Sequence, residues 1–471
     1  MDIRITPQKL HGTVAAVPSK SDLHRALICA AFADAPTAIF QPSPAPLSQD
    51  IEATIACLRA MGAEISVFDE KELPVLEDAS APGSGAASES AFAAVSGNAS
   101  AARILVTPVR NVPDKVVLHC GESGSTARFM LPVAAAVCKE AVLTGSGRLP
   151  ERPMSPLTDE LARHGCSISS PHLPMTVSGG FSEKTADSSV NTEIPEFSLP
   201  GSISSQFITG LLLAAPLTGG TKIHLTTPLA SASYVNMTID TMGRFGVHVK
   251  KTDDGFEVAS GSYRSPGTYM TDGGWSSAAF FIAADVLSAG SAGSVSVTGL
   301  RSESLQGDRV IERIADHFYT LKNRGGSNAA FASEKNAGNP DMTIIDAENI
   351  PDLVPIIAVL AALTPGRTHI INAARLRLKE SDRLRATSEM LSTLGADIVE
   401  EPGGLMITGK ERLEGGTVSG CNDHRIVMSA AIASIGCRKE VTILGAEAVA
   451  KSYPSFWEDF RKLGGAAILF A

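Results

Sequence analysis

The chain has 471 residues, of which 44% are hydrophobic and 19% charged, and its formal net charge is -10 at pH 7. This length exceeds the roughly 250 to 300 residues at which one hydrophobic core stops growing, so we expect two domains. The apolar content excludes disorder throughout, and the acidic balance disfavours a general nucleic-acid or anionic-membrane surface.

The first twenty residues contain no apolar run of the kind found in secretion signals, and no later stretch approaches the roughly 18 apolar residues of a membrane span.

Six polar caps that lead into Ala-rich apolar runs predict six helices. The six stretches are SKSDLHRALICAAFA (19–33), GESGSTARFMLPVAAAV (121–137), GSISSQFITGLLLAA (201–215), GGWSSAAFFIAADVL (273–287), PDLVPIIAVLAAL (351–363) and NDHRIVMSAAIAS (422–434). Because these runs are apolar almost all round, we expect buried helix bodies whose N-terminal turns alone reach a ligand.

A second element recurs out of phase with the first, namely an amphipathic helix that ends at a glycine before a strand. The glycines are Gly62, Gly165, Gly246, Gly395 and Gly464, and a sixth copy near 314–326 lacks its glycine. Interleaving the two series gives six α/β units that group as three plus three, which predicts two similar α/β domains. Two stretches outside the pattern, 76–102 and 323–339, are interpreted as mobile surface insertions.

Helix N-termini carry unpaired N–H groups and a partial positive charge, so several of them aimed at one cleft would bind anions. The caps also carry polar and charged side chains, namely Lys20, Arg25, Arg128, Ser204, Ser205, Gln206, Asp352 and Arg425. The stretch ARLRLKESDRLRA (374–386) adds Lys379 and Arg383 around Glu380, at the start of an amphipathic helix that we expect to be capped near Ser381. We therefore predict a pocket for small anionic ligands with a potential proton donor inside it.

Other chemistries are disfavoured by missing patterns. No G-x-x-x-x-G-K-[ST] motif is present and no G-x-G-x-x-G follows a strand, which excludes the common ATP and NAD sites. The seven cysteines are scattered without a C-x-x-C pair, so neither a disulfide framework nor a zinc site is indicated. We expect reduced thiols, a cytoplasmic protein and no metal.

Eight motifs, taken in order, resemble those of the EPSP synthase family, the 3-phosphoshikimate 1-carboxyvinyltransferases. They are VPSKSDLHRA, GESGSTARF, ERPMSPL, GSISSQF, IPDLVP, RLKESDRL, NDHRIVM and AKSYPSF, running from Lys20 to Phe456. The resemblance implies an inside-out α/β barrel, that is, two similar α/β domains, each of three inverted βαβαββ-type units. The expected domains are 19–271, and 1–18 together with 272–471, with the active site in the cleft between them.

The resemblance also implies a reaction. The 5-hydroxyl of shikimate 3-phosphate attacks C2 of phosphoenolpyruvate, C3 is protonated, and phosphate leaves to give 5-enolpyruvylshikimate 3-phosphate on the shikimate pathway to aromatic amino acids. No cofactor is implied, and the partners are these two substrates rather than a nucleic acid or a membrane. We expect a monomer whose two domains close over the substrates.

Residue roles follow from the same motif positions. The residues implied for shikimate 3-phosphate are Lys20, Ser21, Arg25, Ser204, Ser205, Gln206, Ser231, Asp352 and Lys379. Those implied for phosphoenolpyruvate are Lys20, Gly124, Arg152, Gln206, Arg383, Arg425 and Lys451, with Arg128 nearby. Asp352 is implied to take the hydroxyl proton, Glu380 to protonate C3 and Lys20 to stabilise charge in the intermediate.

Two positions depart from the family pattern. Glu122 stands where asparagine is common, and Gly274 stands where aspartate is common, with Asp272 as a candidate replacement two residues earlier. We interpret Glu122 as a helix cap that points away from the anion site, the alternative being an acid that weakens phosphoenolpyruvate binding. Two rival functions stay open: enolpyruvyl transfer to a UDP-sugar, disfavoured by Ser21 and by the lack of a cysteine-bearing glycine-rich loop, and a non-catalytic binding protein.

Overall fold

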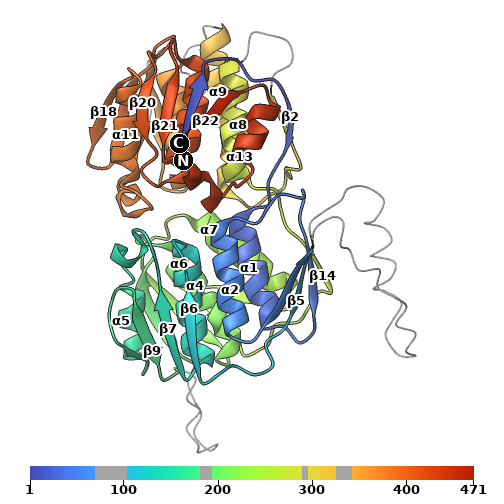
Figure 1. Cartoon of the computed structure of the whole chain (residues 1–471). Coiled ribbons are helices and arrows are strands. Elements are labelled where there is room, and N and C mark those ends of the chain that lie inside the picture. The colour runs from blue at the N-terminus through green and yellow to red at the C-terminus, as the bar shows by residue number, and fades with distance from the viewer. Residues whose placement is uncertain (69–102, 181–193, 289–294, 325–341, 471) are drawn as a thin grey trace, which may run out of the picture.

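The computed structural model describes residues 1–68, 103–180, 194–288, 295–324 and 342–470 of the chain (Figure 1). The predicted insertion at 76–102 lies outside the described residues, as does that at 323–339 apart from its first two residues. Figure 1 shows two α/β halves, with both chain termini in one of them. We refer to the half that contains the first helix, α1, as the α1 half, and to the other as the α8 half. Within the described ranges, none of the helices is both long and apolar enough to cross a membrane.

One unit of the α1 half shows the pattern that the whole fold repeats. Its first two strands, β6 and β7, pair in parallel, while β9 pairs antiparallel with β7 and with β8, giving the sheet order β6-β7-β9-β8. A parallel pair needs a crossover connection, and the buried helix α4 supplies it. The elements are β6 (Lys115–His119), α4 (Gly124–Val137), β7 (Glu140–Thr144), η1 (Leu149–Glu151), α5 (Leu157–Arg163), β8 (Ser167–Ile168) and β9 (Met175–Ser178).

The same βαβαββ order occurs once more without interruption in each half. In the α1 half it comprises β10 (Glu196–Pro200), α6 (Ser205–Ala214), η2 (Ala215–Leu217), β11 (Thr221–Thr227), α7 (Ala232–Arg244), β12 (Val249–Lys251) and β13 (Gly255–Val258). In the α8 half it comprises β16 (Met342–Asp346), η6 (Pro351–Leu353), α10 (Val354–Ala362), β17 (Arg367–Ile371), η7 (Ala374–Leu378), α11 (Arg383–Thr393), β18 (Asp397–Glu401) and β19 (Gly404–Thr408).

The remaining units borrow strands from distant parts of the chain. The unit of α1 (Lys20–Ala31), β3 (Thr37–Phe40), α2 (Gln49–Ala60), β4 (Glu64–Phe68) and β5 (Arg103–Thr107) takes its first strand from β14 (Thr268–Met270). The unit of β20 (Gly416–Ser419), α12 (His424–Ala433), η8 (Ser434–Gly436), β21 (Val441–Leu444), η9 (Ala446–Lys451), α13 (Phe456–Lys462) and β22 (Ala466–Phe470) is completed by β1 (Asp2–Thr6). In the last unit, β2 (Gly12–Ala15) pairs with β15 (Val295–Thr298) beside α8 (Trp275–Ser288), η3 (Gly307–Val310) and α9 (Ile311–Arg324).

The chain therefore passes between the halves twice, close to Pro18 and Gly273, which face each other in an isolated antiparallel bridge. The expected N-terminal strand lies in the α8 half, because β1 pairs with β21 and β22 there. Each of the five predicted glycines that end amphipathic helices has a positive φ, between 78° and 104°. Such a backbone conformation strains any residue with a Cβ atom, so glycine is required where the helix turns into the strand.

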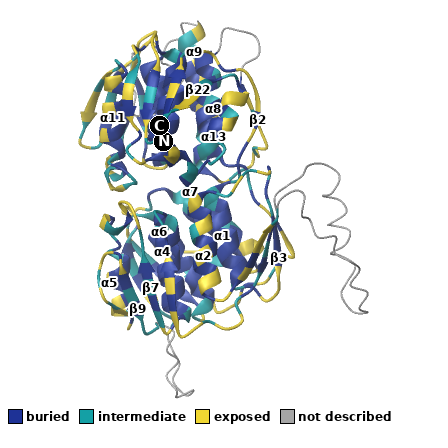
Figure 2. Ribbon diagram, in the orientation of Figure 1, coloured by how far each residue is buried: buried dark blue, intermediate teal, exposed yellow. Residues whose placement is uncertain are grey.

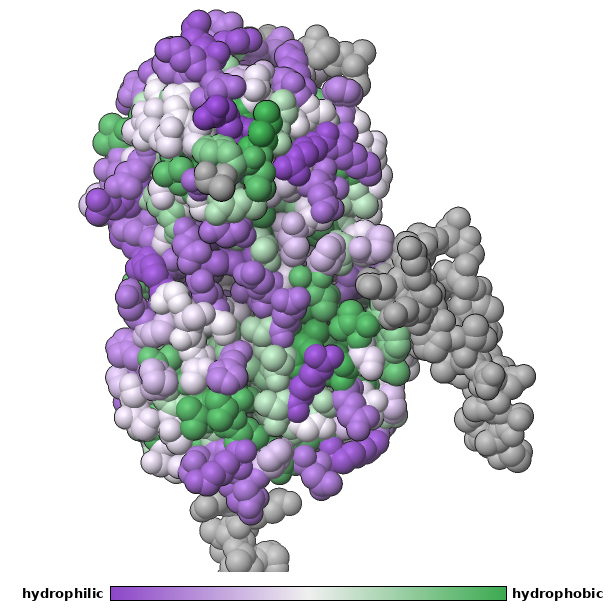
Figure 3. Space-filling model, viewed as in Figure 1, coloured by the Kyte–Doolittle hydropathy of each residue, from purple (hydrophilic) through white to green (hydrophobic). Residues whose placement is uncertain are grey.

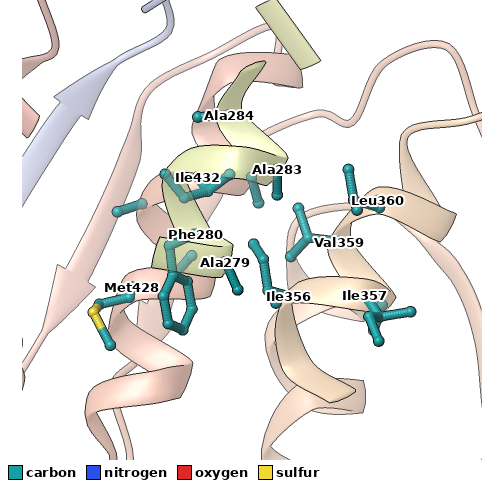
Figure 4. Close-up of a cluster of buried hydrophobic side chains, with 14 of the residues drawn as sticks. Ala279, Phe280, Ala283, Ala284, Ile356, Ile357, Val359, Leu360, Met428 and Ile432 are labelled. Atoms are coloured by element: carbon teal, nitrogen blue, oxygen red, sulfur yellow. The ribbon is translucent and has the colours of Figure 1, made fainter. Parts of the chain in front are cut away.

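The buried hydrophobic residues form two clusters that follow the two halves. One cluster takes its members from residues 23–269, and the other takes its members from 3–17 and 275–467. Figure 2 shows these buried positions running through the helices of both halves, and Figure 4 shows Phe280, Ile356 and Ile432 from the packed helices α8, α10 and α12. Burial of each such side chain contributes about 1.5 to 3 kcal/mol. The predicted buried helix bodies are confirmed.

Candidate active site

A cleft lies between the halves, where helix N-termini from both halves converge. All six predicted polar caps contribute to its lining, through the first turns of α1, α4, α6, α8 and α12 and through η6 in front of α10. The lining includes every predicted site residue except Lys451. Figure 3 shows hydrophilic side chains along much of the boundary between the halves on the face that it presents. The arrangement aims several positive helix ends at one space, as an anion site requires.

The first two turns of α1 carry Lys20 and Arg25, on a helix that Ser19 caps by accepting a hydrogen bond from the Asp22 N–H. Lys20 Nζ lies 2.6 Å from Asp50 Oδ2, so the ammonium group is held in place by one carboxylate. Arg25 is buried and donates to Thr238 Oγ1 at 2.8 Å and to the Tyr234 carbonyl at 3.0 Å. Burial lowers the pKa of Arg25 to about 10, which leaves it protonated at neutral pH.

Two buried arginines, Arg128 and Arg152, face the N-terminus of α4 at Gly124. A Cβ atom on Gly124 would lie 2.7 to 2.8 Å from their guanidinium nitrogens, so glycine lets both groups approach the helix end. Burial and then the neighbouring Arg152 lower the pKa of Arg128 to about 9. Within the described residues, Arg128 Nε and Arg152 Nε and Nη1 have no hydrogen-bond partner, although Arg152 Nη1 lies 3.6 Å from Glu380 Oε1 in an ion pair. Buried N–H donors without partners beside a helix N-terminus indicate a place for a bound anion.

Serine hydroxyls and an amide line the cleft at the N-terminus of α6. Ser204 caps this helix by accepting from the Gln206 N–H at 3.3 Å. The Gln206 side chain bridges to α4, because its Oε1 accepts from Arg128 Nη1 at 2.8 Å and its Nε2 donates to Ser125 Oγ at 2.9 Å. Ser231, at the start of α7, has a left-handed backbone with φ 56°. Such strain at a cleft residue is typical of a functional position.

Arg383 connects several of the charged side chains that the α8 half contributes. Its side chain is 1% exposed and pairs with three carboxylates. The partners are Asp352 Oδ1 at 3.0 Å, Glu380 Oε2 at 2.5 Å and Asp423 Oδ2 at 2.9 Å. The helix α11 begins at Arg383 and is capped by Asp382, the residue next to the predicted cap position near Ser381. Ser381 instead donates its hydroxyl to Asp423.

The cations of this network control the ionisation of its carboxyl groups. Burial alone would raise the pKa of Asp352, but the surrounding positive charges outweigh burial and hold that pKa well below its ordinary value. They are Arg425, 2.8 Å from Asp352 Oδ2, and Arg383 and Lys379, 3.0 and 3.6 Å from Oδ1. The pKa of Glu380 is likewise lowered, because the nearby cations again outweigh burial. Both groups are ionised in the substrate-free protein at neutral pH.

Lys451 lies beside the cleft and pairs across the two halves. Its Nζ lies 2.7 Å from Glu122 Oε2 and 2.6 Å from the Asn422 carbonyl oxygen. Glu122 also accepts from Asn422 Nδ2 at 3.0 Å. The cap of α4 is Ser123, which accepts from the Thr126 N–H, so the interpretation of Glu122 as a helix cap pointing away is wrong.

Comparison with known proteins decides the family. The model of the family EPSP synthase (3-phosphoshikimate 1-carboxyvinyltransferase) matches residues 5–110 and 94–460. The chain belongs to the EPSP synthase family. The 3-phosphoshikimate 1-carboxyvinyltransferases of Clostridium acetobutylicum and Clostridium kluyveri are 38% and 39% identical to this chain. Each alignment covers 98% of this chain and 97% of the relative's chain. The EPSP synthase of Acinetobacter baumannii has the same fold, with a TM-score of 0.70 at 22% identity over 99% of this chain and 100% of its own. The predictions of fold class and of an enolpyruvyl transferase of the EPSP synthase family are confirmed.

The second departure from the EPSP synthase pattern, Gly274, leaves its position in the cleft without an acidic side chain. Gly274 lines the cleft, and a Cβ atom there would lie 3.2 Å from the Val17 carbonyl oxygen. Asp272 lines a separate groove and binds Gln306, so it does not replace an acid at position 274 in the cleft. Another buried acid, Asp308, lines the cleft instead.

Several cleft residues of this EPSP synthase family member were missed by sequence reasoning. They are Asp50, Tyr234, Gln306, Asp308, Arg375 and His424. His424 follows the cap residue Asp423 in the last predicted cap, and its position there was the available signal. Tyr234 and Asp308 carry no such signal, because neither lies at the predicted start of a buried helix.

Proposed function

We propose that this chain transfers the enolpyruvyl group of phosphoenolpyruvate to the 5-hydroxyl of shikimate 3-phosphate in the cleft between its halves. The observation that supports this proposal best is the pair of buried arginines, Arg128 and Arg152, beside Gly124, because some of their N–H groups have no hydrogen-bond partner among the described residues. Membership of the EPSP synthase family supplies the identity of the substrates. Both carry a phosphate and a carboxylate, which arginine binds through two parallel hydrogen bonds.

The lining of the cleft supports a subsite for each substrate. For shikimate 3-phosphate the proposal assigns Lys20, Ser21, Arg25, Ser204, Ser205, Gln206, Ser231, Asp352 and Lys379, all of which line the cleft. For phosphoenolpyruvate it assigns Lys20, Gly124, Arg152, Gln206, Arg383, Arg425 and Lys451, of which Lys451 alone lies outside the described lining. Lys451 Nζ donates to Glu122 and to the Asn422 carbonyl, so a phosphoenolpyruvate oxygen would share this ammonium group with the Glu122 carboxylate.

The proposed chemistry needs one base, one acid and a stabilising cation. Asp352 takes the proton of the 5-hydroxyl as that oxygen attacks C2, and Glu380 delivers a proton to C3. When the C2–O bond to phosphate then breaks, a C–H bond of the C3 methyl group breaks as well and returns one proton to Glu380, so that the C2–C3 double bond forms again. Lys20 stabilises the negative charge of the tetrahedral intermediate. The low pKa of both carboxyls makes them weak bases in the free protein, and bound anionic substrates raise their proton affinity by offsetting the cations.

The division of the core supports two domains, 19–271 and 1–18 with 272–471, that move as units around the double crossover near Pro18 and Gly273. We expect them to close when substrates bind, because the two subsites take residues from both halves. Expulsion of water would then strengthen every charge interaction in the site. A monomer in the cytoplasm completes the proposal.

The choice of acceptor is tested by supplying phosphoenolpyruvate with one acceptor at a time and identifying the product by mass spectrometry. The acceptors are shikimate 3-phosphate, shikimate without its phosphate, and UDP-N-acetylglucosamine. We expect an enolpyruvyl product from shikimate 3-phosphate and a rate lower by at least about a hundredfold from shikimate, since a charged hydrogen-bonded site left unfilled costs several kcal/mol. Transfer to the UDP-sugar would replace the proposed acceptor.

The ion pair of Glu122 with Lys451 predicts an effect on phosphoenolpyruvate alone. The Glu122→Gln substitution removes the carboxylate that competes for the lysine, so we expect the KM for phosphoenolpyruvate to fall by about two- to fivefold, the range of a partly exposed ion pair. Steady-state kinetics measure it, with Glu151→Gln as control, since Glu151 is exposed. A higher KM in the Glu122→Gln variant would show instead that the ion pair holds the halves in the binding arrangement.

A further inference from the structure

A second carboxyl group, that of Asp308, lies in the cleft opposite Asp352. Asp308 is 4% exposed and belongs to η3 of the α8 half. The hydroxyl of Tyr234, from α7 of the α1 half, lies 3.4 Å from Asp308 Oδ2 and 3.4 Å from Asp352 Oδ2. The two carboxyl groups therefore share one hydroxyl group, across the boundary between the halves.

The segment that carries Asp308 is held firmly. Gln306 Oε1 accepts from Ser19 Oγ and from the Trp275 N–H, both at 3.1 Å, and its Nε2 donates to the Gly273 carbonyl at 2.8 Å. A Cβ atom on Gly307 would lie 2.5 Å from Ser233 Oγ, so glycine allows this segment to approach α7. These contacts fix Asp308 at the crossover between the halves, next to Tyr234.

The environments of the two carboxyl groups differ in charge. Asp352 is in contact with three cations, as described above, whereas the charged and titratable groups that act on Asp308 are Asp352, Arg425 and Tyr234, together with the Ser276 hydroxyl. Burial, and then the negative charge of Asp352, raise the pKa of Asp308 to about 6, and Arg425 offsets this in part. Two carboxyl groups whose environments separate their proton affinities are the usual arrangement of an acid-base pair.

A tyrosine hydroxyl has one hydrogen and can donate it to one carboxylate at a time. The two carboxylate oxygens lie at equal distance from the tyrosine oxygen. Both can form a hydrogen bond with it only when one carboxyl group is protonated and donates to the tyrosine oxygen, while the tyrosine hydroxyl donates to the other. Asp352 already accepts from Arg383 and Arg425, so a proton there would break a charged contact. When the two carboxyl groups take up one proton, the geometry therefore favours Asp308 over Asp352 as its carrier.

We infer that Asp308 is the proton store of this site: it receives, through the Tyr234 hydroxyl, the proton that Asp352 takes from the acceptor hydroxyl. The inference rests on the proposed function. The O–H bond of the acceptor breaks as its oxygen attacks, and an O–H bond forms on Asp352. Asp352 then passes this proton to the Tyr234 oxygen while the Tyr234 hydrogen moves to Asp308, which restores ionised Asp352. The proton leaves Asp308 with the departing phosphate, and no electron is transferred.

The kinetic test compares the parent with the Asp308→Asn variant between pH 5 and 8. Substrate phosphates also ionise near pH 6, so the diagnostic quantity is the ratio of parent to variant kcat/KM, in which their effects cancel. Asp308 must be ionised to accept a proton, so we expect this ratio to rise with pH through about 6, the pKa of Asp308, and then to level off. At the plateau we expect a ratio of about 10 to 100, smaller than the loss expected for the primary base.

Two further variants separate proton transfer from structure. Tyr234→Phe keeps both carboxyl groups and should reproduce the loss, whereas Glu303→Gln, an exposed acid on the same segment, should match the parent. Because the pKa of Asp308 is raised in the folded protein, ionisation of Asp308 costs stability as pH rises through about 6. The Asp308→Asn variant should therefore be no less stable than the parent at pH 8. A constant rate ratio across pH, or a full rate in Tyr234→Phe, would overturn the inference.

An infrared titration of the substrate-free protein keeps this result separate from the proposed function. The carbonyl band of protonated carboxyl groups should lose intensity between pH 5 and 7 by more in the parent than in Asp308→Asn. The comparison is needed because the pKa values of Asp22 and Asp459 are also raised. An equal band change in both proteins would overturn the inference by itself. If the band changes as expected but the protein does not turn over shikimate 3-phosphate, the proposed function fails, and the role of Asp308 in that reaction fails with it.

Discussion

The Asp352→Asn substitution is expected to lower kcat by about 10²- to 10⁴-fold, the range lost when a positioned general base is removed. Asparagine keeps the shape of the side chain but cannot accept the proton of the acceptor hydroxyl. The three cations around position 352 would then lack one negative charge, which favours rather than opposes anionic substrates. We therefore expect binding of shikimate 3-phosphate, measured by calorimetry, to stay within about tenfold of the parent, equivalent to one hydrogen bond.

A matched substitution controls for the loss of a carboxylate as such. Asp397 is exposed at the start of β18 and outside the cleft, so Asp397→Asn should leave kcat and binding unchanged. Turnover of Asp352→Asn within about threefold of the parent would show that another group takes the hydroxyl proton, since base catalysis is worth far more than that factor.

The Arg383→Leu substitution is expected to cost about 3 to 5 kcal/mol of folding stability, because it leaves buried carboxylates without their partner. Asp423 is 0% exposed and loses an ion pair of 2.9 Å, and Glu380 and Asp352 lose theirs as well. Arg385 supplies the control two residues along the same helix, since its ion pair with Glu389 is exposed and should contribute little to stability. Urea unfolding of the parent, Arg383→Leu and Arg385→Leu measures all three values.

The pH dependence of this loss has a definite sign. The pKa values of Asp352, Glu380 and Asp423 are lowered in the folded protein, because nearby positive charges, that of Arg383 among them, outweigh burial. Such groups stabilise the fold above the ordinary carboxyl pKa, and the contribution is lost as pH falls through the folded values. The difference in unfolding free energy between parent and Arg383→Leu should therefore be large at pH 7 and shrink below about pH 4. A difference that stays constant with pH would mean that lost packing, not charge, causes the destabilisation.

Local signals in the sequence predicted much of this fold. A polar cap followed by an apolar run indicates a buried helix through hydrogen bonding and burial that act within a few residues, and the start of α1 after Ser19 shows this. Gly62 and Gly464 mark helix ends because of a local backbone requirement. Ser381 and Asp382 are adjacent and both are good helix caps, so local chemistry does not show which of them caps α11. In the structure the Ser381 hydroxyl donates to the buried Asp423, and the Asp382 carboxylate caps the helix.

The features that sequence reasoning missed depend on contacts between distant residues. Glu122 and Lys451 are 329 positions apart, and no local pattern distinguishes an acid that forms an ion pair from one that caps a helix. Asp308 lies in a polar stretch of the sequence, which gives no sign that it is buried. Its burial follows from the place where the chain crosses between the halves, where Gln306 donates to the Gly273 carbonyl. The expected assignment of 1–18 and 19–271 to different domains came from the family resemblance and not from a local pattern, because β2 and β14 each pair with a strand more than two hundred residues away.

The most direct test of the account is release of inorganic phosphate from phosphoenolpyruvate, measured with and without shikimate 3-phosphate, with the organic product identified by mass spectrometry. The Asp352→Asn variant, purified in parallel, controls for contaminating activity. We predict phosphate release that requires shikimate 3-phosphate, equals the amount of 5-enolpyruvylshikimate 3-phosphate formed, and is nearly absent in the variant. Phosphate released without shikimate 3-phosphate, or none released although the protein binds shikimate 3-phosphate, would contradict the assignment of this cleft as a site of enolpyruvyl transfer.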